Sequence, residues 1–327
     1  LVGSEMCIRD RRMTMSKIIF GIDVGGTTCK CGTFSEEGEL LRKEEIPTRK
    51  DEGGSLILPD ISEYIKGVLA DMNMTTEDVA GIGMGLPGAC LEDGTVNKCI
   101  NLGWGVFNAA NALSELTGIP VKIGNDANMA ALGEFWVGGG SEYNSMVMVT
   151  IGTGVGGGVI IDGKPLYGFN GAAGEIGHLP LVEGETESCN CGKKGCLEQV
   201  ASATGIVRTA NRMLAESDMP SSLRSVPYIS AKVIFDEAKG GDALAIQVTE
   251  YVCRYLGKGL ACAAGMVDPE VFVIGGGVSA AGEYFINLID KYYKECVFHA
   301  SRQTKIVKAA LGNDAGMYGA AKLILGN

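Results

Sequence analysis

Short apolar runs that end in glycine-rich turns recur along this chain. KIIFGIDVGGTTCKCGTFSEEGELL, residues 17–41, predicts a strand, a glycine turn, a second strand and a further turn at GluGluGly. MVMVTIGTGVGGGVIIDGKPLY, residues 146–167, has the same order of segments. Two remote copies of one unit predict a duplicated architecture with a phosphate-sized glycine turn in each half.

Segments of helical periodicity alternate with apolar strands in the rest of the chain. Helices are predicted for ISEYIKGVLADM and NAANALSELTG, and buried strands for VAGIGMGLPG and VKIGND. Further helices are predicted over 198–214, 230–240, 242–265 and GMYGAAKLIL, with the strand of VFVIGGGVSAAGE before the last of them. This alternation predicts helices packed on a mostly parallel sheet.

The composition is that of an acidic globular protein. The 327 residues are 46% hydrophobic, which is enough chain and core for two domains. The 28 basic and 39 acidic residues give a net charge of −11, and such a surface repels phosphate backbones, so no nucleic-acid partner is expected. Glycine and threonine interrupt the apolar tracts before they reach the length of a bilayer-spanning helix, so no membrane partner is expected.

The first residues, LVGSEMCIRDRRMT, lack the apolar core and cleavage site of a secretory signal. They resemble translated sequencing-adapter read-through, and we expect residues 1–15 to be a non-native or disordered leader, with the protein starting at Met13 or Met15. Eleven cysteines without an export signal indicate a reduced, cytoplasmic protein. The cysteines are therefore expected to bind metal or to be bystanders rather than to form disulfides.

The first glycine-rich turn, Asp23-Val24-Gly25-Gly26-Thr27-Thr28, is a candidate phosphate loop. Gly25 and Gly26 let backbone amides approach phosphate oxygens, Thr27 adds a hydroxyl donor, and Asp23 at the strand end can hold Mg²⁺ through water. The same residues fit a tight hairpin equally well.

The second turn, which includes Gly152, Thr153 and Gly154, also fits the dinucleotide pattern G-x-G-x-x-G. That pattern requires a helix next, whereas VIIDGKPLY continues as a strand, so a β-turn-β phosphate loop is favoured over a nicotinamide-dependent oxidoreductase. A third stretch, with Gly276 and Gly277, leads into a helix and can place a flat or charged ligand against the helix start. Close packing of helix and strand is the alternative there.

Asn125 and Asp126 stand at the end of the strand VKIGND. Ligands collect at the carboxyl ends of parallel strands, so a carboxylate there is well placed as a general base. The alternative is a helix N-cap for NMAALGEFW, and position alone favours the cap.

Cys189, Cys191 and Cys196 offer three thiolates within eight positions, and His178 lies eleven positions before the first of them. One histidine and three cysteines make a closed tetrahedral zinc site, and closed sites are structural. C-x-C-x₄-C is not the commonest zinc spacing, and bystander cysteines are the alternative, but the nearby histidine favours zinc. Zinc would aim Glu175, Glu198 and the ring edge of His178 at one place suited to sugar hydroxyls, unless the glutamates are merely exposed on the surface.

Together these residues resemble the ROK family of bacterial sugar kinases and sugar-responsive repressors. The motifs DVGGTT, LPG, GNDAN, IGTGVGGG, GEIGH, CNCGKKGCLE and IGGGVS occur in the family's order from Lys17 to the C-terminus. The resemblance implies an α/β protein with the actin-like ATPase (ribonuclease H-like) fold, in which two duplicated α/β lobes flank a cleft. The implied small lobe comprises residues 16–125 plus about 313–327, and the implied large lobe comprises 126–312 with the zinc site.

The resemblance also implies roles for individual residues. Asp126 corresponds to the catalytic base in ATP-dependent phosphorylation of a sugar 6-hydroxyl. The residues that correspond to sugar contacts are Gly88, through its backbone, and Asn125, Glu175, His178 and Glu198. His178 is expected to use one ring nitrogen for zinc and the other for sugar. The positions matching contacts to ATP and Mg²⁺ are Asp23, Gly25, Gly26, Thr27, Gly152, Thr153, Gly154, Gly276 and Gly277.

Within the family, CGKKGCLEQVASATGIV is most similar to glucokinases of Gram-positive bacteria, although N-acetylmannosamine kinase, N-acetylglucosamine kinase and fructokinase share the motifs. Repressor members carry a winged-helix domain, whereas only a short non-helical tract precedes the first strand here, so an enzyme is favoured. The alternative from a different class is a catalytically silent sugar-binding regulator, against which the intact Asp23 and Asp126 argue. Family precedent predicts a homodimer or homotetramer.

Overall fold

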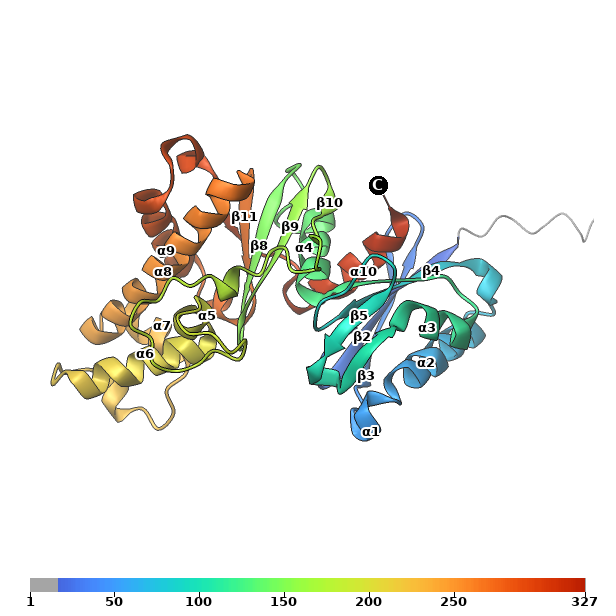
Figure 1. The fold of residues 1–327 in the computed structure, drawn as a ribbon, viewed down its shortest axis with the longest axis horizontal. Coiled ribbons are helices and arrows are strands. Elements are labelled where there is room, and N and C mark those ends of the chain that lie inside the picture. The colour runs from blue at the N-terminus through green and yellow to red at the C-terminus, as the bar shows by residue number, and fades with distance from the viewer. Residues whose placement is uncertain (1–16, 327) are drawn as a thin grey trace, which may run out of the picture. The chain divides into compact units, whose positions relative to one another are not determined.

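The computed structural model describes residues 17–326 (Figure 1). The expected leader, residues 1–15, lies outside the described residues. The chain divides into two compact units. The first comprises the chain up to Asp126 together with the segment that begins at Ala320, and the second comprises Ala127–Gly319.

The first unit contains a five-stranded mixed sheet. Its central strand β1 (Ile18–Val24) pairs antiparallel with β2 (Thr28–Ser35), which pairs antiparallel with β3 (Leu40–Pro47). On the other side of β1 follow β4 (Val79–Leu86) and β7 (Val121–Asn125), both parallel to it. The order of strands is therefore β3-β2-β1-β4-β7.

Helices α2 (Ile57–Asp71) and α3 (Ala109–Thr117) belong to this unit, as do the short α1 (Asp51–Gly54) and a separate hairpin of β5 (Thr95–Cys99) and β6 (Trp104–Asn108). Apolar residues of α2 recur every three or four positions, so one face of the helix is buried in the core with the sheet. Short 3₁₀ turns occur at Thr76–Asp78 and Ile100–Leu102. The hairpin was not predicted from the sequence.

The second unit repeats the sheet of the first. Its order is β10 (Lys164–Pro165), β9 (Val155–Ile161), β8 (Met146–Ile151), β11 (Val271–Gly275) and β12 (Lys305–Lys308). The first three strands pair antiparallel and the last two join in parallel, as in the first unit. The predicted duplication is therefore confirmed, and a glycine turn joins the first two strands in chain order of each sheet.

The second unit is otherwise mainly helical (Figure 1). Its helices are α5 (Glu198–Ala201), α6 (Ala203–Glu216), α7 (Ala231–Lys239), α8 (Ala243–Val267) and α9 (Glu283–Cys296). Buried residues of α6 to α9 form one core with β8, β9 and β11. Short 3₁₀ turns are found at Ile176–His178, Ser222–Ser225, Gly277–Ala281, His299–Gln303 and Gly312–Asp314.

The single helix expected over 198–214 is wrong in one detail, because it is interrupted at Ser202. This residue has extended backbone angles and ends α5. Its hydroxyl oxygen then accepts a hydrogen bond from the Gly205 amide at 3.0 Å and so caps α6. The break places the N-terminus of α6 against the second glycine turn, as described below.

Two helices contain the points at which the chain passes from one unit to the other. These are α4 (Asp126–Val137) and α10 (Ala315–Leu325). The buried Glu134 on α4 accepts hydrogen bonds from the amides of Gly139, Ala310 and Leu311, at 2.8, 2.9 and 2.7 Å. Glu134 thereby ties the end of α4 to the chain that leads into α10. Among residues 17–326, no helix combines the length and hydrophobicity that a membrane crossing requires.

Candidate active site and metal centre

The end of β7 brings Asn125 and Asp126 next to Gly88. Strand β7 ends at Asn125 and α4 begins at Asp126, so Asp126 occupies both positions considered from the sequence, the strand end and the helix start. In the parallel pairing of β4 with β7, Leu86 lies beside Asn125. The Asn125 side-chain amide donates a hydrogen bond to the Gly88 carbonyl at 2.9 Å. Three predicted site residues of the first unit are therefore neighbours.

Asp126 also acts electrostatically on the loop that follows β4. Burial, and then electrostatic interaction with Asp126 and Cys99, raise the pKa of the Cys90 thiol to about 12. The Cys90 thiol points to the Gly88 carbonyl oxygen at 3.7 Å. Cys90 is therefore a neutral thiol at physiological pH.

Hydrogen bonds hold the carbonyl groups of the first glycine turn, while the space beside Gly26 is open. The Gly25 amide donates to the Thr28 carbonyl at 3.0 Å. Thr48, which follows β3, donates its hydroxyl to the Gly25 carbonyl at 2.8 Å and its amide to the Thr27 carbonyl at 2.9 Å. A Cβ atom at Gly26 would meet nothing within 4 Å. The turn thus offers an open backbone surface beside Asp23, as phosphate contact requires. Thr48 was missed because nothing in the local sequence connects it with the turn.

The second glycine turn is held by the start of α6. The Ala203 amide donates to the Gly152 carbonyl at 2.8 Å, and the Thr204 hydroxyl donates to the Thr153 carbonyl at 3.1 Å. Gly276 lies beneath this turn with φ 79°, and a Cβ atom there would overlap the Ile151 backbone. Only glycine combines a positive φ with the absence of a Cβ atom, and both are needed at this position. The two predicted nucleotide-side stretches of the second unit therefore meet.

Beside these stretches is a pocket of about 370 Å³. Its lining includes Gly152, Thr153 and Gly277, which were predicted to contact nucleotide, and Lys232 and Phe235 of α7, which were not. Lysine and phenylalanine are ordinary residues for a helix such as α7, so the local sequence contained no signal for them. The pocket combines backbone amides with an aromatic ring, which are suitable contacts for phosphates and for a planar base respectively.

The four residues expected to bind zinc lie together. Each residue offers one ligand atom, a ring nitrogen from His178 and a sulfur from Cys189, Cys191 and Cys196. These four atoms all lie within 4.8 Å of one another. Cys191 Sγ is 3.5 Å from Cys196 Sγ, and Cys189 Sγ is 3.7 Å from His178 Nδ1. Tetrahedral zinc with bonds of about 2.3 Å to sulfur and about 2.1 Å to nitrogen would place its ligand atoms ~3.5 to 3.8 Å apart. The cluster therefore fits a zinc ion in donor chemistry, and these two separations match the spacing of zinc ligands.

The thiols of this cluster need a positive charge to ionise together. Burial and a hydrogen bond to Glu198 raise the pKa of Cys189, and burial raises that of Cys196. By contrast, a hydrogen bond from the Lys193 backbone lowers the pKa of the exposed Cys191. A divalent cation among the three sulfurs would favour the thiolate form of all of them.

Glu175 and Glu198 lie near the two ring nitrogens of His178, at the edge of the metal cluster. His178 Nδ1 faces the cysteines and lies 3.7 Å from Glu198 Oε1, whereas Nε2 lies 3.9 Å from Glu175 Oε2. The side chains of Glu175 and His178 are 50% and 37% exposed, and that of Glu198 is 17% exposed. Glu198 is thus not an ordinary surface glutamate, because its carboxylate accepts hydrogen bonds from Cys189 Sγ at 2.8 Å and from the Val155 amide at 3.4 Å.

The loop that carries Glu175 and His178 lies directly against β9. A Cβ atom at Gly177 would overlap the Val155 carbonyl oxygen, so the loop can approach the strand this closely only with glycine there. The Cys196 end of the metal cluster joins the same surface, since the Leu197 amide donates to the Leu179 carbonyl at 2.9 Å. These contacts explain how side chains far apart in sequence converge.

Comparisons with known proteins agree with this architecture. The ROK family model matches residues 19–327. The chain is 40% identical over 309 residues to a glucokinase of Halalkalibacterium halodurans, which covers 93% of this chain and 94% of that protein. It superposes on the ROK hexokinase of Thermus thermophilus with a TM-score of 0.78 at 32% identity, covering 93% of this chain and 96% of that one.

A second solved structure is the ROK-family glucokinase of Streptomyces griseus in complex with glucose and AMPPNP. Its TM-score is 0.73 at 32% identity, and the match covers 94% of this chain and 98% of that chain. The family match extends over nearly the whole described chain, and both sheets follow the same duplicated order. The chain therefore belongs to the ROK family and has its actin-like ATPase fold.

Proposed function

We propose that this protein is an ATP-dependent glucokinase, which transfers the γ-phosphoryl group of ATP to the 6-hydroxyl of glucose. The observation that carries the proposal is the position of Asp126 at the end of β7, beside the Asn125 amide that bonds to Gly88. The similarity to proteins named glucokinase, one of them solved with glucose and AMPPNP, supports glucose as the sugar and ATP as the donor.

In the proposed reaction Asp126 acts as the general base. Its carboxylate accepts the proton of the sugar 6-hydroxyl while that oxygen attacks the γ-phosphorus in line. The new O–P bond forms as the bond to the β-phosphate oxygen breaks, and ADP leaves. A base of this kind contributes roughly 10²- to 10⁴-fold, while positioning and charge stabilisation supply most of the rate.

Sugar binding is assigned to Asn125, Glu175, His178 and Glu198, with the backbone at Gly88. His178 Nε2 is the ring nitrogen available for a sugar hydroxyl, because Nδ1 faces the cysteines. Glutamate carboxylates accept hydrogen bonds from hydroxyl groups, and the imidazole can donate or accept according to its tautomer. These side chains therefore suit a ligand that carries several hydroxyls.

Nucleotide binding is assigned to the two glycine turns and to Gly276 and Gly277. Backbone amides at the turns would bind phosphate oxygens, and Thr27 and Thr153 would add hydroxyl donors. The pocket beside Phe235 would receive the base. Mg²⁺, expected near Asp23, would supply charge neutralisation for the phosphates.

Zinc is assigned a structural role at His178, Cys189, Cys191 and Cys196. The set has four protein ligands, which leaves no open position for substrate. We infer one zinc per chain, measurable by elemental analysis of the purified protein. We also infer a cytoplasmic homodimer or homotetramer on family precedent, to be checked by light scattering.

The test is ATP-dependent ADP release with glucose, mannose, fructose, N-acetylglucosamine and N-acetylmannosamine, each compared with Asp126→Asn. A preference for glucose that disappears in the variant is expected. Activity confined to an N-acetyl sugar or to fructose would keep the mechanism but identify a kinase of the same family with a different sugar substrate. Full activity of Asp126→Asn would refute the assigned base, and no activity on any sugar would favour a silent sugar-binding regulator.

A further inference from the structure

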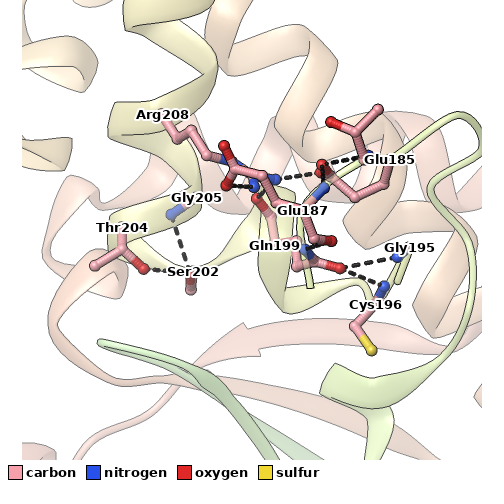
Figure 2. Close-up of polar contacts among 10 residues, drawn as sticks. Glu185, Glu187, Gly195, Cys196, Gln199, Ser202, Thr204, Gly205 and Arg208 are labelled. Atoms are coloured by element: carbon pink, nitrogen blue, oxygen red, sulfur yellow. Dashed lines mark hydrogen bonds and ion pairs between the residues drawn. The ribbon is translucent and has the colours of Figure 1, made fainter. Parts of the chain in front are cut away.

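A glutamine behind the metal cluster ties together the two ends of the cysteine loop, defined here as residues 187–196 (Figure 2). Gln199 Oε1 accepts hydrogen bonds from the Gly195 amide at 2.8 Å and the Cys196 amide at 3.1 Å. Gln199 Nε2 donates to the Glu187 carbonyl at 3.0 Å. The side chain is buried, with the residue 9% exposed, so these bonds are shielded from water.

Arg208 of α6 reinforces the same loop from outside. Its guanidinium donates to the Glu187 carboxylate at 2.7 Å and to the Gln199 carbonyl at 2.8 Å, and it forms an ion pair with Glu185. Figure 2 shows Glu185, Glu187 and Gln199 around the guanidinium of Arg208. The planar fork of arginine can make several such bonds at once, which lysine cannot.

The arrangement connects the metal cluster with Glu198 and with the second glycine turn. Gln199 directly follows Glu198, which is assigned to sugar binding, and Cys196 is one of the expected zinc ligands. Helix α6, which carries Arg208, also holds the second glycine turn through Ala203 and Thr204. One network therefore joins the cysteine loop, Glu198 and the helix that supports the phosphate turn.

A metal ion would constrain only four side-chain atoms of this region. The remaining backbone of the cysteine loop must be ordered by the protein, and any part left disordered would lose entropy each time zinc binds. Hydrogen bonds at both ends of the loop remove much of that loss in advance. Groups outside the ligand set that orient metal ligands in this way commonly govern metal retention.

We propose that Gln199 and Arg208 are positioning residues that preorganise the cysteine loop for zinc and hold Glu198 in place for the sugar. This inference rests on the proposed zinc site and on the proposed sugar kinase activity. It predicts an effect on metal retention that can be measured without any substrate, and an effect on sugar binding that follows from it.

The test compares Gln199→Met, Gln199→Glu and Arg208→Lys in the purified holoenzyme. Gln199→Met keeps the length of the side chain but leaves the amides of Gly195 and Cys196 without their acceptor. Gln199→Glu keeps an acceptor for both amides and should fall between the wild type and Gln199→Met. Matched controls are Gln247→Met on α8 and Arg302→Lys, both at exposed positions.

The first readout is zinc retention against a competing chelator, followed with a colorimetric zinc indicator. We expect Gln199→Met to retain zinc about 10- to 100-fold less tightly, with a smaller loss in Arg208→Lys and none in the controls. The second readout is steady-state kinetics, in which we expect the KM for glucose to rise more than kcat falls. Excess zinc should restore part of the KM.

Several results would overturn the inference. One is wild-type zinc retention in both Gln199→Met and Arg208→Lys; another is a lower melting temperature with unchanged zinc retention, which would indicate a purely structural role. If Gln199→Met does not fold, Arg208→Lys alone decides. A wild-type protein without zinc would also overturn the inference, while kinase activity in that protein would leave the proposed function standing.

Discussion

The side-chain amide of Asn125 donates a hydrogen bond to the carbonyl oxygen of Gly88, with Nδ2 2.9 Å from the oxygen. The bond joins the ends of two neighbouring parallel strands, β4 and β7. It orients the loop after β4 relative to the first residue of α4, Asp126. A side-chain hydrogen bond to the backbone therefore positions the loop assigned to the sugar next to the residue assigned to catalysis.

Asn125→Ala should weaken glucose binding with a small effect on folding. One hydrogen bond of this kind contributes about 0.5 to 1.5 kcal/mol, so we expect the KM for glucose to rise roughly 3- to 10-fold. Steady-state kinetics with Asn211→Ala, an exposed asparagine of α6, provide the control. An unchanged KM in Asn125→Ala would remove Asn125 from the sugar site.

Cys191→Ser should lose the bound zinc and loosen the sugar site. Apparent binding free energies of structural zinc are on the order of 10 kcal/mol, so loss of one thiolate should lower metal content well below one per chain. Zinc content, melting temperature and the KM for glucose are measured together. Cys262→Ser removes an exposed thiol of α8 and should behave as wild type. Full zinc content in Cys191→Ser would refute the four-ligand assignment.

Glu134→Gln should destabilise the protein although it is nearly isosteric. The carboxylate accepts three backbone amides in a buried site, and an NH₂ group in place of one oxygen would face donors rather than acceptors. An unsatisfied buried polar group costs about 1 to 3 kcal/mol. The urea unfolding midpoint should therefore fall relative to Glu142→Gln, which alters an exposed glutamate. Equal midpoints would contradict this account.

Asp242 should make a pH-dependent contribution to stability. Burial opposes its ionisation, but the backbone amides of Ala245 and Ser222 and the hydroxyls of Ser221 and Ser222 lower the pKa of this helix cap overall. A lowered folded-state pKa stabilises the protein above the unfolded value of about 3.9, and that stability is lost as the pH falls through the folded value.

The matched variant is Asp242→Asn, which can still cap α8 but does not titrate. We expect wild type to be more stable than Asp242→Asn near neutral pH, and the difference to shrink below about pH 4. Urea unfolding of both proteins across this range measures the difference. Glu237, which accepts a hydrogen bond from the Ser222 hydroxyl at 2.6 Å, is present in both. A difference independent of pH would contradict the prediction.

Much of the fold could be predicted because its signals are local. Apolar strands that flank glycine turns are recognisable over a few residues, and their repetition at 17–41 and 146–167 predicted the duplication that both sheets show. The strands β3, β5, β6, β10 and β12 escaped prediction because they are short or largely polar, so their pairing partners define them. The break at Ser202 escaped for a related reason, since a capping serine and a helical serine look alike in sequence.

Residue chemistry was likewise sufficient to propose the metal site, whereas the base role of Asp126 came from the family resemblance, because position alone favoured a helix cap there. Three cysteines and a histidine in close spacing favour a zinc site over bystander cysteines, and a carboxylate at a strand end marks only a candidate position. Contacts such as those of Thr48, Gln199, Arg208 and Phe235 depend on backbone that arrives from distant segments. Glutamine, arginine, threonine and phenylalanine are common in any sequence, and their partners, and with them their roles, exist only once the chain has folded.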